Sequence, residues 1–323
     1  MNPDVAAAIE RLQADGVLSP DLAGLLRPVA RGERVSVRTE LRILLYAGVL
    51  LATGGVAVLV RENLDRLGPV AVAIGLTLAA LLCLGWAVRR GPAYSPGPVE
   101  SPHLAFDYVL LLGVLLASAT LAYVEVQFTP LGDRWPWHFL FVALLAGALS
   151  VRYDSRSLFS LALGSLAAWR GVDVSQGAMQ RALPGGAPEP LRREALLCGL
   201  VFLALGYGFS RGTVKPHFEG VATHFGALLL LGGLLSGCGL NSREELAYAA
   251  ALLASGVALA AYGAGSRRFS LVTLGILGAY AAAMALMLWL ELPATLYLLL
   301  FATSALGLLG GLLLVRRHLK ENV

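Results

Sequence analysis

A dense group of charged and amide side chains, RENLDR (residues 61–66), follows the first apolar run of the chain without a spacer. Such groups could bind or gate a polar solute at a membrane surface. If the helix instead continues past the apolar run, the charges form two complementary pairs at i,i+4 spacing, each worth about 0.2–0.5 kcal/mol. Gly68 and Pro69 would then end this helix and start the next. We interpret RENLDR as a protruding helix end and keep four candidate polar positions: Arg61, Glu62, Asn63 and Asp65.

Ionisable groups inside membrane spans usually mark transporters and proton relays. Glu125 ends the third apolar run, Glu291 lies in a tight hairpin, and His224 lies one turn into the seventh run. Glu125 and Glu291 fall where a membrane interface is expected, and a single histidine near a boundary is usually only hydrogen-bonded. These three residues are candidate polar positions, with a structural role weighed against a role in transport.

No motif of a catalytic or metal site is present. His217, Glu219 and His224 match no standard zinc spacing. A Ser/His/Asp set, a P-loop and an HExxH motif are all missing. The three cysteines (Cys83, Cys198, Cys238) lie in apolar runs without metal-type spacing. The sequence therefore predicts no catalytic residue, no cofactor and no metal, and a protein that is not an enzyme.

The composition of the chain indicates the class of protein in which these candidate polar positions lie. The chain has 323 residues, 57% of them hydrophobic and 14% charged, with a mean hydropathy of +0.71. Soluble domains average about 45–50% apolar and about 25% charged residues, so lipid must solvate much of this chain. The net charge of +4 is spread through short loops, which reports membrane topology and not binding to nucleic acid. We predict an all-α polytopic membrane protein.

Residues 1–42 form a separate polar module. Asn2-Pro3-Asp4 and Ser19-Pro20-Asp21 are the same start signal twice: an N-cap residue, a proline and an acid at the positive helix end. Gly16 ends the first predicted helix. This helical pair is too small to hold a core alone, so we expect it to pack on itself, on the membrane domain or on a protein partner.

The membrane domain is predicted over residues 43–315, followed by a cytoplasmic tail at 316–323. Ten apolar runs fall at about 43–60, 69–88, 107–126, 137–151, 157–169, 195–210, 221–240, 246–264, 270–290 and 294–315. Most can cross a core of roughly 30 Å, but the run 157–169 reaches only about 20 Å as a helix. Residues 174–183 are either a short interfacial helix or a bare loop.

Charge decides between nine and ten crossings. With ten crossings and a cytoplasmic N-terminus, 17 Lys and Arg lie on the cytoplasmic side and 8 outside. Without the crossing at 157–169 the division is 15 to 10. The positive-inside rule therefore favours ten crossings, with both termini in the cytoplasm.

An internal similarity relates residues 137–170 to 248–281. Ser155-Arg156 recurs 111 positions later as Ser266-Arg267, and Leu163-Gly164 recurs as Leu274-Gly275. If the two segments are duplicated, they should form hairpins of the same direction with these residues superposed.

Several of these residues together resemble a known family. The segments 15–19 (DGVLS), 45–50 (LYAGVL) and 62–65 (ENLD) resemble the bacterial multi-pass proteins catalogued as domain of unknown function 2157 (DUF2157), most clearly over residues 1–90. Leu64 stands where members often carry Trp. The resemblance implies a membrane protein without an established activity, and it carries no site residue.

Two functions of different class remain. The first is a non-enzymatic scaffold, sensor or accessory protein, acting in the bilayer and through a protein partner at residues 1–42. The second is a transporter or channel for a small or apolar solute. Polar groups meeting at the middle of the membrane would favour transport, and a dry bundle would favour the scaffold.

Overall fold

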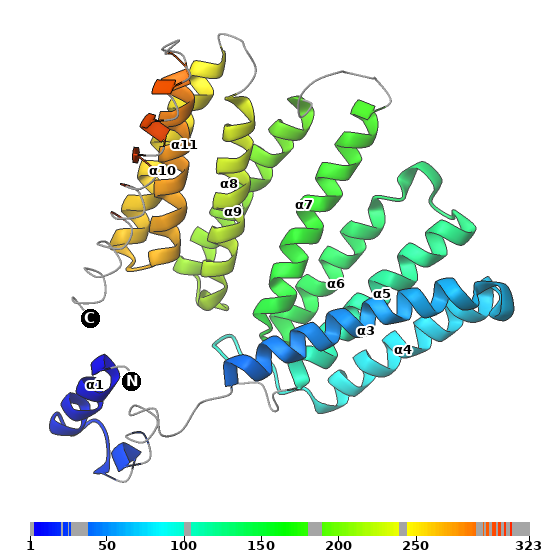
Figure 1. Ribbon diagram of the computed structural model, residues 1–323. Helices are drawn as coiled ribbons and strands as arrows, with labels where there is room; N and C mark the ends of the chain where they lie inside the picture. Colours follow the sequence, from blue (N-terminus) through cyan, green and yellow to red (C-terminus); the bar gives the residue numbers. More distant parts are fainter. Residues whose placement is uncertain are drawn as a thin grey trace. The chain divides into compact units, whose positions relative to one another are not determined.

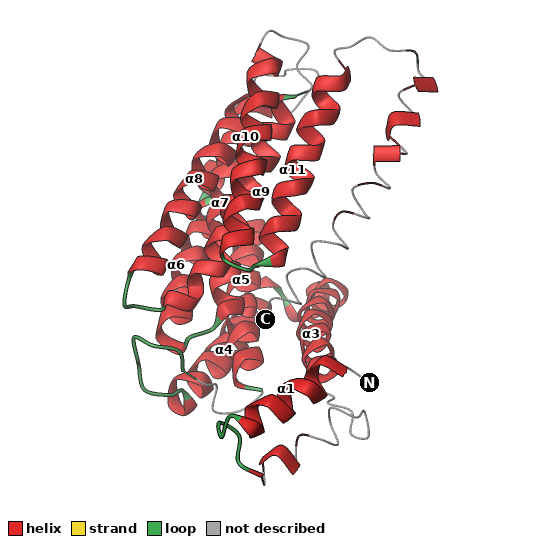
Figure 2. Cartoon of the chain, turned by 90° about the vertical axis from the view of Figure 1, so that its left-hand side faces the viewer, coloured by secondary structure: helices red, strands yellow, loops and turns green. Residues whose placement is uncertain are grey.

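The computed structural model describes residues 3–20, 22–24, 26, 38–99, 105–179, 189–238 and 244–288, with isolated positions between 293 and 311. The described residues form helices, turns and loops and include no strand (Figure 2). The chain divides into two compact units, Met1–Leu67 and Gly68–Val323.

Unit 1 begins with the predicted helical pair. Helix α1 (Pro3–Ala14) ends at Gly16, whose φ of 70° is the left-handed conformation expected of a terminating glycine. The Ser19 hydroxyl accepts a hydrogen bond from the Leu22 N–H, as its predicted N-cap role requires. Ile9 and Ala23 are buried against each other. The stop signal at Gly16 and the start signal at Ser19 are thus confirmed, whereas Asn2 lies outside the described residues.

Helix α3 (Arg38–Leu67) is continuous over 30 residues. It contains the first apolar run and also the RENLDR segment, so the prediction that this helix continues past the run is confirmed. The predicted domain boundary at residue 42 lies inside α3, because no proline interrupts residues 38–67. Gly68, with φ 73°, separates α3 from α4, which carries Pro69 at its first position.

Unit 2 is built from four helical hairpins (Figure 1). They are α4 (Pro69–Arg90) with α5 (Phe106–Phe128), α6 (Trp137–Tyr153) with α7 (Arg156–Met179), α8 (Glu189–Arg211) with α9 (Glu219–Gly237), and α10 (Glu244–Gly265) with α11 (Phe269–Leu288). Short 3-10 helices, η1 (Gly132–Arg134) and η2 (Pro216–Phe218), precede α6 and α9. The second helix of each hairpin contacts both helices of the next one: α5 contacts α6 and α7, α7 contacts α8 and α9, and α9 contacts α10 and α11.

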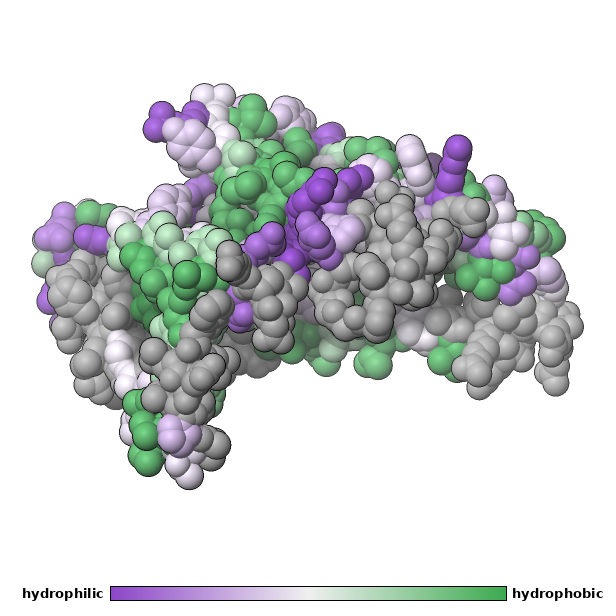
Figure 3. Space-filling model, turned by 90° about the horizontal axis from the view of Figure 1, so that it is seen from above, coloured by the Kyte–Doolittle hydropathy of each residue, from purple (hydrophilic) through white to green (hydrophobic). Residues whose placement is uncertain are grey.

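Nine of the ten predicted apolar runs therefore fall in helices α3 to α11, and the tenth lies largely outside the described residues. Within the described part of the chain, six helices are long and apolar enough to cross a membrane: α4, α5, α8, α9 with η2, α10 and α11. Large apolar side chains such as Leu82 and Leu144 are 73% and 65% exposed, and hydrophobic residues cover much of the surface in Figure 3. Surface of this kind is suited to lipid, and the fold is that of an all-α polytopic membrane protein.

The predicted length of the fifth run is wrong. Helix α7 extends from Arg156 to Met179, so its 24 residues reach about 36 Å. Residues 174–179, for which a separate interfacial helix or a loop was predicted, belong to α7. The helix continues because Arg170, which interrupts the apolar pattern, forms a two-bond ion pair with Glu194 of α8.

The hairpin α8–α9 has a seam where the two backbones touch. A Cβ atom added to Gly199 would lie 2.7 Å from the Leu230 backbone nitrogen, and one added to Gly226 would lie 2.7 Å from that of Leu203. No side chain larger than hydrogen fits such a contact. Gly199 and Gly226 therefore allow the close approach of α8 and α9.

The hairpin α10–α11 repeats this seam. A Cβ atom added to Gly256 would lie 2.5 Å from the Ala279 backbone nitrogen, and one added to Gly275 would lie 2.4 Å from that of Ala260. Gly256 and Gly275 therefore occupy the places of Gly199 and Gly226. The two hairpins are packed in the same register.

The hairpins α4–α5 and α6–α7 also pack through small residues at equivalent positions. In each hairpin two buried small residues lie seven positions apart on the first helix: Ala80 and Ala87, Ala143 and Ser150, Gly199 and Gly206, Gly256 and Gly263. The residue four positions after the first of each pair meets a small residue of the second helix: Leu84 with Gly113, Gly147 with Ala162, Leu203 with Gly226, and Ala260 with Gly275. All four hairpins thus share one packing rule.

This seam changes the predicted register of the internal similarity. Ala143 corresponds to Gly256 and Ala162 to Gly275, a separation of 113 residues instead of 111. The turns agree with the longer separation, because Asp154 and Arg267 both adopt left-handed φ, 61° and 54°. Ser155 therefore corresponds to Arg268 and not to Ser266. A common origin of the hairpins remains a prediction.

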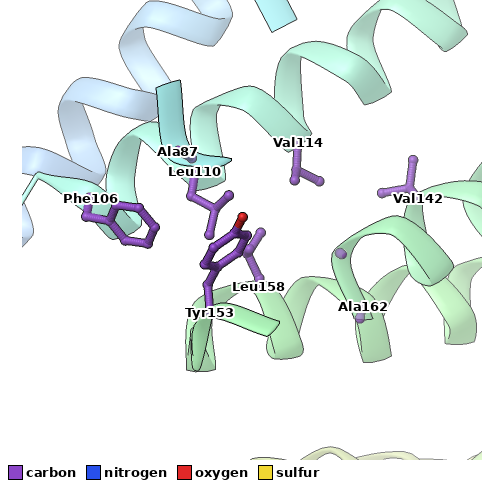
Figure 4. Packing of buried hydrophobic residues seen from close by; sticks show 9 residues of the cluster. Ala87, Phe106, Leu110, Val114, Val142, Tyr153, Leu158 and Ala162 are labelled. Carbon is purple, nitrogen blue, oxygen red and sulfur yellow. The ribbon is translucent and has the colours of Figure 1, made fainter. Parts of the chain in front are cut away.

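The first two hairpins share a buried apolar core (Figure 4). Phe106 and Leu110 of α5 pack with Leu158 of α7, and all three are fully buried. The Tyr153 ring meets the Phe106 ring edge-on, with centroids 5.6 Å apart. This core fixes the α6–α7 turn against the start of α5.

Candidate functional site

The four hairpin turns lie at one end of unit 2, which we call the turn end. Asp154, in the α6–α7 turn, contacts both the loop after α4 and the loop before α9. Glu219, at the start of α9, pairs with Arg268 in the α10–α11 turn. At the opposite end, which we call the far end, helices α5, α7 and α9 finish and helices α6, α8 and α10 begin.

Asp154 is the centre of a first cluster of charges, the Asp154 cluster, which also contains Lys215 and His217. Its side chain is 4% exposed. One carboxylate oxygen faces the Lys215 ammonium at 3.4 Å and the His217 Nε2, and the other accepts the Val99 N–H. The Asp154 backbone is left-handed, with φ 61°, a conformation that aspartate adopts more readily than most residues. The turn thereby aims this carboxylate inward.

Lys215 is fully buried, which is rare for a lysine. Its ammonium donates a hydrogen bond to the Gly97 carbonyl at 3.2 Å, and its backbone N–H donates to the Pro96 carbonyl at 2.8 Å. The ammonium also lies 5.7 Å from the centre of the Tyr94 ring, within cation–π range. Lys215 therefore holds the proline-rich loop 91–99 against the next two hairpins.

His217 completes the Asp154 cluster. Its Nε2 faces Asp154, and its ring meets Phe218 edge-on with centroids 4.7 Å apart. Its Nδ1 is buried and has no hydrogen-bond partner among the described residues. The cluster joins three hairpins through one carboxylate.

A second cluster, the Glu219 cluster, joins the last two hairpins. Arg268 donates two hydrogen bonds to the Glu219 carboxylate, at 2.9 and 2.6 Å, in the strong paired geometry of a guanidinium with a carboxylate. The Tyr262 hydroxyl donates a third, at 2.7 Å. These hydrogen bonds to Glu219 raise the pKa of Arg268, so the guanidinium stays charged. Helices α9 and α10 and the following turn are thus held together.

The far end carries its own cross-links. Arg170 of α7 pairs with Glu194 of α8 at 2.7 Å. The buried Arg192 donates to the Ser236 hydroxyl at 3.2 Å and lies 5.2 Å from the Tyr248 ring centre. Because α7 meets its neighbours at the turn end through Asp154 and near the far end through Arg170, it spans the same distance as α8. Whether α7 crosses the membrane stays a prediction, because α7 is not among the six candidate spans.

The structure separates the residues for which a metal site had been considered. His217 contacts Asp154, and Glu219 binds Arg268. His224 interacts with the Gly220 carbonyl and the Ser270 hydroxyl, at 2.6 and 2.7 Å. Within the described residues no three His, Cys, Asp or Glu side chains converge on one point.

The other candidate positions lie apart from these clusters. Glu125 accepts the Leu131 N–H at the far end. The remaining candidates from RENLDR lie in α3, but their side chains are outside the described part, and so is Glu291. Their proposed roles stay predictions.

The sequence analysis missed Asp154, Lys215 and Arg268 as a site. Each was treated only as a charged loop residue. Lys215 and Arg268 were included in the count of basic residues that predicted the membrane topology. Their partners are 49 to 63 residues away in the chain. One signal in the sequence could have indicated this site. Charged residues are scarce in this apolar domain, yet each hairpin turn contains some of them.

Chemically, the oppositely charged groups of both clusters pair with one another, and His217 Nδ1 is left without a hydrogen-bond partner among the described residues. No nucleophile lies beside a free base in them, and every charge has an opposite partner. The arrangement is suited to fastening hairpins together at a membrane boundary.

A family model supports the assignment made from the sequence. Residues 10–159 match the family described as "Predicted membrane protein (DUF2157)". Neither a curated protein nor a solved structure matches the chain. The matched segment includes α3 to α6, the α6–α7 turn and Asp154. The predicted resemblance is thus confirmed: residues 10–159 match the DUF2157 family of predicted membrane proteins.

Proposed function

We propose that this protein is a non-enzymatic scaffold, sensor or accessory protein of the bacterial inner membrane, acting on a protein partner through residues 1–42. The observation that supports this most is where the charges lie. In the described part of unit 2 they gather toward the turn end and the far end, where they cross-link hairpins. Between these ends the helices meet through Gly, Ala and aliphatic side chains. Such a bundle is suited to the role of a rigid scaffold.

The charge pattern also supports the proposed orientation. Each of the four hairpin turns brings two Lys or Arg, from Arg89 and Arg90 to Arg267 and Arg268. The positive-inside rule then puts the turn end in the cytoplasm. Both chain termini lie on that same side in the ten-crossing topology.

Transport of a small or apolar solute is the competing function. The repeated hairpin seam favours it in one respect, because many transporters are built from internal repeats. Against it, the described part of the bundle holds no charged cluster midway between the turn end and the far end.

A truncation distinguishes the two functions. Deleting residues 1–37 is expected to leave membrane insertion intact and to abolish rescue of whatever defect follows loss of the gene. The reason is that the scaffold acts through the N-terminal pair. The measurement is complementation, with protein abundance followed by immunoblot.

Two point variants sharpen this test. Ile9→Asp puts a charge into the buried contact with Ala23 and should also abolish rescue, whereas Val17→Asp, at a position 72% exposed, should not. Full rescue by the truncated chain would contradict the scaffold and favour transport by the membrane domain alone.

A further inference from the structure

A cavity of about 490 Å³ opens at the far end, between the last turns of α5 and the start of α6. Its volume falls in the usual range of small-molecule sites, roughly 300–1,000 Å³. Its wall is formed by six side chains of both helices and their connection: Ala122, Glu125, Val126, Thr129, Trp135 and His138. Most of this wall is apolar, so its few polar atoms decide what can bind.

Glu125 supplies the charge of the cavity. One of its carboxylate oxygens, Oε2, accepts the Leu131 N–H at 3.1 Å, while Oε1 has no hydrogen-bond partner within the described part. Arg134, the next cation along the chain, is exposed and forms no ion pair with Glu125 there. The carboxylate therefore keeps an unused acceptor and an uncompensated charge.

His138 supplies a second acceptor. Its side chain is buried, and its Nδ1 lies 2.6 Å from the Trp135 carbonyl oxygen. Since a carbonyl can only accept, Nδ1 carries the hydrogen, and in the neutral ring Nε2 is an acceptor. The Trp135 ring stacks on the imidazole, with centroids 5.6 Å apart, and fixes its orientation.

The rim of the cavity is held in a strained conformation. Thr129 adopts φ 45° and ψ 45°, which is unusual for a β-branched residue. Its N–H donates to the Glu125 carbonyl at 2.8 Å. Glu125 is thus fixed through both its backbone and its side chain, so the acceptor is preorganised before any ligand arrives.

We propose that this cavity binds an amphiphile with a primary ammonium group on an apolar chain. Glu125 Oε1 and His138 Nε2 can accept hydrogen bonds from a ligand, and the carboxylate favours a positively charged one. The Thr129 hydroxyl and the Trp135 indole N–H are neutral groups of the same wall and do not offset this preference for positive charge. The apolar wall, including the Trp135 indole, receives the alkyl part. The cavity lies at a helix end, the depth at which amphiphile head groups meet a bilayer. This site goes beyond the proposed scaffold function and does not depend on it.

The test compares three probes of equal chain length on the full chain in dodecyl maltoside. We expect octylamine to bind at least about tenfold more tightly than octyltrimethylammonium, which cannot donate hydrogen bonds, or octanol, which has no charge. Isothermal titration calorimetry near neutral pH measures all three. Equal affinities for octylamine and octyltrimethylammonium would overturn the proposal without any variant.

Variants locate the binding. Glu125→Gln is expected to weaken octylamine binding at least about tenfold and to leave octanol unchanged. Glu245→Gln, an acid of the far end outside the cavity, is the matched control and should bind like the unchanged protein. Ala122→Leu should weaken all three probes by filling the cavity. Octylamine binding that is unaffected in a folded Glu125→Gln variant would refute the site.

The natural source of the ammonium group can be a lipid head group or a soluble amine. Nanodiscs of phosphatidylglycerol, with or without phosphatidylethanolamine, separate these sources. If phosphatidylethanolamine weakens octylamine binding, the lipid competes for the cavity. If octylamine binds equally in both, the occupant is soluble, and either result upholds the ammonium site.

Discussion

Replacing Asp154 by alanine is expected to destabilise the protein by about 3–5 kcal/mol, because the change leaves a buried ammonium without its counter-charge. Lys215 is fully buried and faces this carboxylate at 3.4 Å. The same substitution removes the acceptor of the Val99 N–H and the partner of His217. Three hairpins would lose the group that joins them.

Thermal unfolding in detergent measures this effect, as a fall of roughly 10 °C in melting temperature. Glu244→Ala is the matched control, since Glu244 is an exposed acid at the far end. The double variant Asp154→Ala/Lys215→Met should recover part of the loss, because it removes both charges. A melting temperature of Asp154→Ala equal to that of the control would show that the Asp154 cluster does not hold the hairpins.

Gly275→Ala is expected to destabilise the α10–α11 hairpin by about 1–3 kcal/mol or more. The added Cβ would lie 2.4 Å from the Ala260 nitrogen and 2.5 Å from the Gly256 oxygen. Both obstacles are backbone atoms, which cannot rotate away as a side chain can. The two helices would have to separate along the seam.

Gly232→Ala is the control for this change. Gly232 is a helical glycine of α9 with no atom within 4 Å of an added Cβ, so alanine should be neutral or slightly stabilising there. Unfolding of both variants is followed by circular dichroism under the same detergent conditions. Equal stability of the two variants would mean that α10 and α11 are not packed closely enough at Gly275 to exclude a methyl group.

The sequence predicted those features that depend on neighbouring residues. The N-cap signal at Ser19, the break at Gly68-Pro69 and the apolar runs all act over a few positions. Helices α4 to α11 follow the apolar runs. The continuation of α3 through RENLDR was also predictable, because no proline interrupts this helix before Gly68. The family resemblance over residues 10–159 followed from short local segments as well.

What escaped prediction depends on contacts between distant residues. Helix α7 passes Arg170 because Glu194, 24 positions later, pairs with it. Asp154 and Lys215 meet only after three hairpins pack. The contacts between the helices of each hairpin relate the two hairpins by an offset of 113 residues. The sequence comparison gave an offset of 111 residues, because Ser155 and Ser266 are the same residue type.

Cysteine accessibility tests the central claim, a dry hairpin bundle with its turns in the cytoplasm, most directly. Single cysteines are placed in a background whose three native cysteines are replaced by alanine. Val114→Cys and Leu252→Cys probe fully buried positions inside the first and last hairpins. Arg156→Cys and Arg211→Cys probe exposed positions at the turn end. A membrane-impermeant maleimide is then applied to either side of sealed vesicles.

The account predicts that the two turn-end cysteines react from the cytoplasmic side only and that the two buried cysteines react from neither side. Labelling of Val114→Cys or Leu252→Cys at a rate near that of Arg211→Cys would reveal a water-filled path and contradict the dry bundle. Labelling of Arg156→Cys and Arg211→Cys from the outer side alone would contradict the orientation.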